Sequence, residues 1–309
     1  FPYTTLFRSM FVKTIKIWIR AVRPFSFTAS IFPVTLGAIL SIKESRFQIW
    51  YFILTLVAII LLHSSVNLLS DHDDFENKVD TKDSYGSSGV IFDNLLSSKQ
   101  ICTAGYILLT LGTIVGMVLS YKRGVFILIL GLVSTFLGYS YSRKPLSLKY
   151  RGLGVPTVFI LFGPLMVMGS YYVQMQSVSL GALIISIPIG LLTTAILQAN
   201  DIRDNLHDRK SGIKTISIIV GEKESKKIYC SLVVIPYIFI IILSIYLIIP
   251  YWSLFCLITI PSAYKNIKKL YPSGDADLSI VNLDKDTAQL HAKFSMILTL
   301  SLLVSSLII

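Results

Sequence analysis

The sequence predicts an all-α polytopic membrane protein, and its composition supports this fold class in three ways. Of its 309 residues, 53% are hydrophobic and only 15% are charged, and the mean hydropathy is +0.70. A soluble domain carries roughly 25% charged residues, so this chain has too few to coat two globules. The apolar content excludes a disordered chain, and the three cysteines exclude a disulfide-stapled secreted one.

Nine apolar runs are predicted to be transmembrane helices. A spanning helix needs about 20 mostly apolar residues, and the runs lack the alternation of a membrane β-barrel. They cover residues 24–42, 47–70, 101–120, 124–142, 154–173, 178–200, 229–249, 251–264 and 291–309. The eighth run is the shortest and the weakest of the nine predictions.

The segment before Met10 is treated separately from the rest of the chain. Residues 1–9 read like the translation of a sequencing-adapter oligonucleotide, so we expect them to be a non-native leader. Residues 10–309 are expected to form a single transmembrane domain.

Basic residues are distributed unequally between the two predicted sides of the membrane. The N-terminal segment and the loops after the second, fourth, sixth and eighth runs hold 24 of the 28 Lys and Arg residues. The positive-inside rule therefore places the N-terminus in the cytoplasm and, after nine spans, the C-terminus outside. This bias also accounts for the net charge of +11, so nucleic acid is not an expected partner.

A first cluster of polar residues follows the second run. Asn67, Asp71 and Asp74 are spaced i, i+4 and i+7. If the helix continues through them, all three side chains project from one face.

A second cluster follows the sixth run. Asn200, Asp204 and Asp208 are spaced i, i+4 and i+8, which again predicts one helical face. Because four runs separate the two clusters, the sequence indicates two four-helix halves followed by a ninth helix.

The chemistry of the two clusters points to a diphosphate held through a metal ion. Two acidic helix ends at one membrane surface would repel each other, and a divalent cation between them would remove that repulsion. Mg²⁺ is usually bound by one or two carboxylates and completes its octahedron with water and phosphate oxygens. A single acidic loop would more simply be a solvated surface, but two matched clusters favour a site. Arg203 and Lys214 are close enough in sequence to contact the diphosphate.

These motifs resemble those of the UbiA superfamily of intramembrane prenyltransferases. The resemblance covers nearly the whole chain. Within this superfamily, the chain most resembles the 1,4-dihydroxy-2-naphthoate polyprenyltransferases of menaquinone synthesis. The segments that carry this resemblance are Arg23-Pro24, Pro33 to Gly37, Tyr139 to Pro145, Lys149 to Gly154, Phe162 to Pro164, Tyr171 to Gln174, and Asn200 to Asp208 with Lys214-Thr215. The sequence departs from the usual pattern at His72-Asp73, at Asp201 and at Ser87-Ser88.

The resemblance implies a reaction and a set of site residues. Mg²⁺ bound by Asp71, Asp74, Asp204 and Asp208 would hold an allylic polyprenyl diphosphate. An aromatic acceptor would attack the allylic carbon and lose CO₂, giving demethylmenaquinone. Asn67 and Asn200 belong to the same catalytic motifs, and the enzyme would lie in the cell membrane with its active site facing the cytoplasm. The other candidate substrate-binding residues are Arg23, His63, Lys78, Tyr139, Tyr141, Lys149, Arg151, Arg203 and Lys214.

Several of these candidates have simpler explanations as well. Arg23, Lys149 and Arg151 are also explained by the positive-inside bias, and Tyr139 and Tyr141 by an interfacial aromatic belt. His63 lies one helical turn before Asn67, and an ionisable residue inside a membrane indicates a functional site by default.

Two alternative functions remain open at the level of sequence. A related prenyltransferase could act on another acceptor, such as 4-hydroxybenzoate. A secondary transporter would also have many spans and a repeat, but its polar residues would lie near the middle of the membrane, whereas the acids here lie at one surface.

Overall fold

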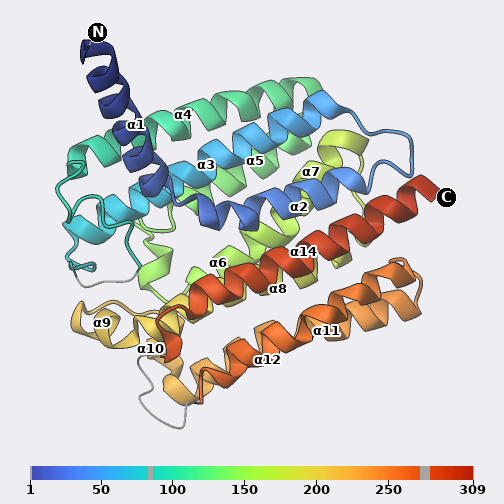
Figure 1. Ribbon diagram of the computed structural model, residues 1–309. Helices are drawn as coiled ribbons and strands as arrows, with labels where there is room; N and C mark the ends of the chain where they lie inside the picture. Colours follow the sequence, from blue (N-terminus) through green and yellow to red (C-terminus); the bar gives the residue numbers. More distant parts are fainter. Residues whose placement is uncertain (1, 83–85, 272–278, 309) are drawn as a thin grey trace.

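Helices dominate the computed structural model, which describes residues 2–82, 86–271 and 279–308 (Figure 1). The α-helices are α1 (Pro2–Val22), α2 (Thr28–Ile39), α3 (Ile49–Glu76), α4 (Ser98–Arg123), α5 (Val125–Tyr139), α6 (Gly154–Ile160), α7 (Met166–Met175), α8 (Leu180–Arg203), α9 (Asn205–Lys210), α10 (Ile216–Val220), α11 (Glu222–Ile245), α12 (Ile260–Lys268) and α14 (Leu283–Ile308). Three 3₁₀ helices are η1 (Pro24–Phe27), η2 (Leu148–Tyr150) and η4 (Tyr251–Thr259), and η3 (Leu161–Leu165) is a π-helix. The described residues contain no β-strand, and the predicted all-α class is confirmed.

Six helical segments in the described part of the chain are long and apolar enough to cross a membrane alone. They are Ile49–Glu76, Ser98–Arg123, Gly154–Met175, Leu180–Arg203, Glu222–Ile245 and Leu283–Ile308. The bent pair Val12–Val22 and Pro24–Ile39 adds a seventh if it crosses as one unit. All nine predicted runs are helical, but α5 has only 15 residues. A polytopic membrane protein is therefore confirmed, whereas nine spans, two halves and the orientation of the termini stay predictions.

A sharp bend separates α1 from α2 at Arg23. Its backbone has φ 54° and lies in the left-handed region, which costs a residue with a Cβ roughly 1–2 kcal/mol. Pro24 then starts η1, and the two helical segments meet at 50°. The bend sends α1 away from the bundle while α2 enters it (Figure 1).

The largest hydrophobic core lies where α2, α8, α11, η4 and α14 pack together. Tyr229, Leu192 and Phe294 are fully buried in it. The π-helix η3 approaches α8 very closely, because a Cβ added to Gly163 would lie 3.0 Å from the Gly190 Cα. Only glycine at both positions permits this contact, which fixes α6, η3 and α7 against α8.

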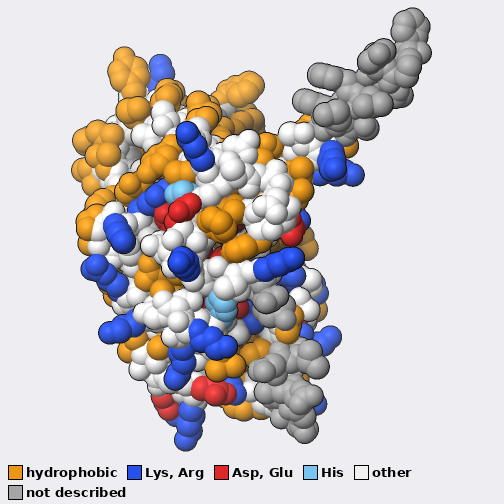
Figure 2. All heavy atoms as spheres, turned by 90° about the vertical axis from the view of Figure 1, so that its left-hand side faces the viewer, with side chains coloured by type: hydrophobic (Ala, Val, Ile, Leu, Met, Phe, Trp, Pro, Cys, Tyr) orange, Lys and Arg blue, Asp and Glu red, His pale blue; other side chains and the backbone are white. Residues whose placement is uncertain are grey.

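The polar ends of α3 and α8 lie at the same end of the bundle (Figure 1). The loop after α3 and the short helices α9 and α10 are found there. Figure 2 shows this end of the molecule, where many Lys and Arg side chains surround a few Asp, Glu and His side chains. The two predicted motifs therefore face one common region.

Candidate active site

The first motif lies on the last turns of α3, which continues to Glu76 as the spacing predicted. Asn67 links this helix to the bend between α1 and α2. Its side-chain nitrogen donates hydrogen bonds to the Val22 carbonyl oxygen at 2.9 Å and to Ser26 Oγ at 3.1 Å. The motif is thereby held against the segment that carries Arg23.

Both acids of the first motif are buried and paired with basic side chains. Asp71 forms an ion pair with Arg23. Asp74 Oδ2 accepts a hydrogen bond from Lys149 Nζ at 2.7 Å, and its Oδ1 accepts one from Tyr150 Oη at 2.6 Å. Burial alone would lower the pKa of Lys149, but Asp74 and its other neighbours raise this pKa well above the ordinary value. Lys149 is therefore a permanent cation beside the motif.

The second motif spans a one-residue break between two helices, which the prediction of one helical face did not include. α8 ends at Arg203, and Asp204 is the N-cap of the short helix α9, which begins at Asn205. The i to i+4 spacing nevertheless survives the break, because the Asp204 N–H donates to the Asn200 carbonyl and the Asp208 N–H to the Asp204 carbonyl, both at 2.9 Å. The three side chains therefore reach the same space.

Arg203 connects the second motif to the last helix of the bundle. It donates to Asn200 Oδ1 at 2.6 Å and to Asp204 Oδ2 at 2.8 Å. Its other terminal nitrogen lies 2.6 Å from Asp284 Oδ2, in the first turn of α14. Only 2% of the Arg203 side chain is exposed, so this guanidinium is buried and holds the second motif against α14.

One polar cavity of about 500 Å³ lies between the two motifs. Its acidic lining residues come from both motifs and from their neighbours: Asp74, Asp80, Asp201, Asp204, Asp208 and Asp284. The basic ones are Arg20, Arg23, Lys149 and Lys285, and the amides are Asn67 and Asn200. Asp71 and Arg203 do not line the cavity, although each contacts a residue that does.

The composition of this cavity suits Mg²⁺. Among the described residues, no three His, Cys, Asp or Glu side chains lie close enough to enclose a metal by themselves. Mg²⁺ does not need such a cage, since it keeps waters and binds substrate phosphates through one or two carboxylates. The donors here are all oxygens, and the Asp284 Oδ1 is buried without a hydrogen-bond donor. The chemistry of the lining therefore fits the predicted ion.

Asp208 leads to a prediction about pH. Burial raises its pKa to about 7; Lys149 opposes this shift, while Asp204, Asp74 and Asp80 add to it. Below about pH 7 the free site holds a proton on Asp208, which a metal ion must displace. We expect the apparent Mg²⁺ affinity, measured from Mg²⁺ titrations of turnover, to weaken as the pH falls below about 7, approaching tenfold per pH unit.

The matched control for this pH experiment is Asp208→Asn. Since asparagine has no titrating proton, this variant should bind Mg²⁺ more weakly, and the pH slope should largely disappear. A Mg²⁺ affinity of the unchanged protein that is constant from about pH 6 to pH 8 would contradict the prediction.

An aromatic chamber of about 210 Å³ adjoins the polar cavity and is lined by four predicted residues. These are His63, Asn67, Tyr139 and Tyr141, and Asn67 and Tyr141 line both spaces. His63 Nδ1 lies 2.6 Å from Ser30 Oγ, and its ring makes an edge contact with Phe162 at 5.2 Å between centroids. The chamber is otherwise mainly apolar, so it suits the reacting carbons of a substrate rather than its phosphates.

Three predicted basic residues are not brought to the cavity. Lys78, Arg151 and Lys214 are exposed. The Arg151 guanidinium donates to the Pro145 carbonyl oxygen at 2.8 Å. The backbone N–H of Lys214 donates to the carbonyl oxygen of Tyr150. Their positions provide no support for diphosphate binding.

Two residues that contact the motifs were not predicted from the sequence. Tyr150 stands between two basic residues that were considered, and its hydroxyl binds Asp74. Asp284 precedes the last apolar run and lies in the first turn of α14, where an acid is usual because it stabilises a helix N-terminus. Because an acid is ordinary at that position, nothing in the sequence indicated its contact with Arg203.

Comparison with known proteins identifies the family. The profile of the UbiA prenyltransferase family matches residues 30–283. The chain belongs to the UbiA prenyltransferase family. It is 34% identical over 255 residues to the mouse UbiA prenyltransferase domain-containing protein 1, covering 80% of this chain and 73% of that protein.

Other UbiA relatives match nearly the whole chain. A 1,4-dihydroxy-2-naphthoate octaprenyltransferase from Bacillus subtilis is 27% identical over 283 residues, covering 92% of this chain and 91% of that protein. A structure of a UbiA homologue from Archaeoglobus fulgidus, bound to GPP and Mg²⁺, has the same fold with a TM-score of 0.64 at 14% identity, covering 93% of this chain and 99% of that one.

Membership of this family makes the chain an enzyme, a prenyltransferase embedded in a membrane. The resemblance inferred from the Asn/Asp motifs is thereby confirmed. The alternative of a secondary transporter is not supported.

Proposed function

We propose that this prenyltransferase transfers the prenyl group of a polyprenyl diphosphate to 1,4-dihydroxy-2-naphthoate, giving demethylmenaquinol (the reduced form of demethylmenaquinone), CO₂ and diphosphate. The observation that carries the proposal is the polar cavity, where both Asp motifs surround one space that continues into an aromatic chamber. The relative named for this acceptor, from Bacillus subtilis, matches over 92% of the chain, which favours the naphthoate.

The polar cavity is assigned to the diphosphate of the donor and to Mg²⁺. The homologue from Archaeoglobus fulgidus that shares this fold binds GPP and Mg²⁺. Here Asp74, Asp204 and Asp208 would hold the ion from the cavity wall, whereas Asp71 does not line the cavity and is paired with Arg23. Bound Mg²⁺ supplies positive charge that stabilises the leaving diphosphate.

The remaining roles follow from the positions of the basic and aromatic side chains. Lys149 is half-buried, remains charged and lines the cavity, so it is assigned to donate to diphosphate oxygens. Arg23 lines the same cavity from the bend and is assigned to the acceptor carboxylate. The chamber around Tyr139 and Tyr141 keeps water from the allylic carbon.

The bond changes of the proposed reaction are balanced without another reactant. The C1–O bond of the donor breaks, and its electron pair leaves with the diphosphate. The ring carbon that bears the carboxylate forms the new bond to C1. The bond to the carboxylate then breaks, its electron pair returns to the ring, and CO₂ departs.

The proposal includes a specific orientation of the enzyme in the membrane. Figure 2 looks onto the bundle end that carries the cavity, and many Lys and Arg side chains gather on it. By the positive-inside rule, we assign this end to the cytoplasmic face of the cell membrane.

Mass spectrometry of lipid-soluble products tests the proposed reaction. Membranes containing the enzyme receive one prenyl diphosphate and, in separate reactions, the naphthoate or 4-hydroxybenzoate. We expect prenylated naphthoquinol that has lost its carboxylate, together with diphosphate release that requires Mg²⁺. Preferential prenylation of 4-hydroxybenzoate would overturn the acceptor, and absence of any prenylated product would overturn the aromatic reaction.

A further inference from the structure

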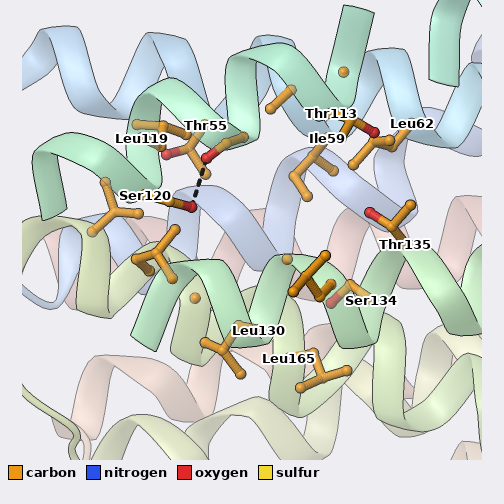
Figure 3. Close-up of a pocket in the computed structure, with 18 of the residues that line it drawn as sticks. Thr55, Ile59, Leu62, Thr113, Leu119, Ser120, Leu130, Ser134, Thr135 and Leu165 are labelled. Atoms are coloured by element: carbon orange, nitrogen blue, oxygen red, sulfur yellow. Dashed lines mark hydrogen bonds between the residues drawn. The ribbon is translucent and has the colours of Figure 1, made fainter. Parts of the chain in front are cut away.

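His63 is a buried side chain of α3 to which the proposed reaction gives no role. Only 9% of this residue is exposed, at the wall of the aromatic chamber. Its neighbour Leu62 and the nearby Ile59 also line an apolar pocket between α3, α4, α5 and α7, where Figure 3 shows both side chains. His63 does not line that pocket. Its ring is directed instead to η1 and α2, the two helices that follow Arg23.

Both ring nitrogens of His63 contact serine hydroxyls of these two helices. Nδ1 lies 2.6 Å from Ser30 Oγ on α2, and Nε2 lies 3.3 Å from Ser26 Oγ on η1. The rings of Phe27 and Phe162 pack edge-on against the imidazole, with centroids 5.5 Å and 5.2 Å away. The orientation of the His63 ring is therefore fixed by contacts with three separate elements, η1, α2 and η3.

The other hydrogen bonds of Ser26 decide which group donates in its contact with His63. The Ser26 hydroxyl has a single hydrogen, which it donates to the Arg23 carbonyl oxygen at 2.9 Å. Its oxygen accepts a hydrogen bond from the Asn67 side-chain nitrogen at 3.1 Å, which leaves one lone pair. Only an N–H of the ring can bond to that lone pair, so we assign a hydrogen to His63 Nε2 from this pattern. The hydrogen bonds therefore run from His63 through Ser26 to the backbone of Arg23.

The backbone of Arg23 is the part of the active site that needs such support. It has φ 54° and ψ 65°, a left-handed conformation that persists only where the surrounding structure enforces it. The Arg23 carbonyl oxygen accepts two hydrogen bonds from Ser26, one from its N–H at 3.0 Å and one from its hydroxyl. Because the side chain follows from this backbone, the same bonds direct the Arg23 guanidinium to the polar cavity, where it pairs with Asp71.

We propose that His63 is a positioning residue that holds Arg23 through Ser26 and thereby sets the affinity of the enzyme for the carboxylate of its acceptor. This inference rests on the proposed function, in which Arg23 is assigned to that carboxylate. A guanidinium binds a carboxylate through two parallel N–H groups, so its plane must be held in one direction. The diphosphate of the donor does not depend on this support, because it is assigned to Lys149 and Mg²⁺.

The test compares His63→Leu with His63→Gln in turnover of 1,4-dihydroxy-2-naphthoate with a prenyl diphosphate. We expect His63→Leu to raise the KM for the naphthoate about threefold to tenfold, the effect of losing one hydrogen bond. The KM for the prenyl diphosphate and kcat should change little. His63→Gln should restore the KM for the naphthoate, since its amide nitrogen reaches the position of Nε2 and donates to Ser26. A role in packing alone would make the two variants equal.

A double variant distinguishes action through Ser26 from direct contact with the acceptor. Ser26→Ala should itself raise the KM for the naphthoate, and adding His63→Leu should raise it no further, because the connection to Arg23 is already broken. Additive effects of the two substitutions would show that His63 acts on the acceptor directly and would overturn the positioning role.

Ser65→Ala is the matched control for these variants. Ser65 is buried on the same helix, and its hydroxyl donates to the Gly105 carbonyl oxygen of α4 at 2.7 Å, so the change removes a comparable hydrogen bond that does not lead to Arg23. Its KM for the naphthoate should equal that of the unchanged enzyme. An unchanged KM in His63→Leu would overturn the role of His63 while the proposed reaction stands. Lack of naphthoate turnover by the unchanged enzyme would instead overturn the proposed reaction, and the assignment of Arg23 with it.

Discussion

Asp74→Ala is expected to lower kcat about a hundredfold to a thousandfold while the protein remains folded in the membrane. The substitution removes a buried carboxylate that faces the polar cavity and contacts both Lys149 and Tyr150. Losing one preorganised group that stabilises developing charge typically has an effect of this size. The remaining activity should need more Mg²⁺, which a Mg²⁺ titration of diphosphate release would measure.

Asp93→Ala provides the matched control for this first prediction. Asp93 lies in the loop after α3, the helix that carries Asp74, and it also pairs with an arginine. Its side chain is 42% exposed, however, and it does not line the cavity. Its removal should leave kcat and the Mg²⁺ requirement unchanged. Rates near those of the unchanged enzyme in Asp74→Ala would contradict the assignment of the first motif to the diphosphate.

Arg203→Met is expected to destabilise the protein by about 3–5 kcal/mol and to abolish most turnover. The substitution leaves the Asp204 and Asp284 carboxylates buried without their shared cation, and removing one partner of a buried ion pair costs about this much. Thermal unfolding in detergent would measure the loss of stability. Arg203 acts by positioning Asp204, since it does not itself line the cavity.

A second substitution distinguishes this electrostatic effect from a general packing defect. Adding Asp284→Asn to Arg203→Met removes one of the uncompensated charges, so the double variant should be more stable than Arg203→Met alone. Arg209→Met, at an exposed position of α9 that donates a hydrogen bond to Asn205, should leave stability unchanged. If the loss of stability in the double variant equals the sum of the losses in the two single variants, the result would contradict the charge network.

The first motif could be predicted from sequence because helical periodicity is a local property. Asn67, Asp71 and Asp74 follow an apolar run with no helix-breaking residue between them, so the extension of α3 was predictable. The second motif looked equivalent. Its helix nevertheless breaks at Asp204, where Arg203 turns back to bind both that residue and α14. The contact with α14 is tertiary, and no pattern within the motif indicates it.

The choice among the basic residues was also beyond the sequence. Lys149 and Arg151 are two positions apart and equally suited to a phosphate, yet Lys149 is half-buried beside Asp74 and Arg151 is exposed. The turn at η2 determines which of them faces the cavity. The aromatic residues were simpler to predict, since Tyr139 and Tyr141 end a helix that packs beside α3.

The bridge from Arg203 to Asp284 also has a consequence for the biosynthesis of the enzyme. Ribosomes release a membrane protein from its N-terminus onward, so α8 emerges long before α14. Until α14 is inserted, Arg203 lacks one of its two carboxylate partners, and the wall of the cavity that Asp284 and Lys285 provide is missing. We therefore expect the enzyme to become competent only when its last described helix has entered the bilayer.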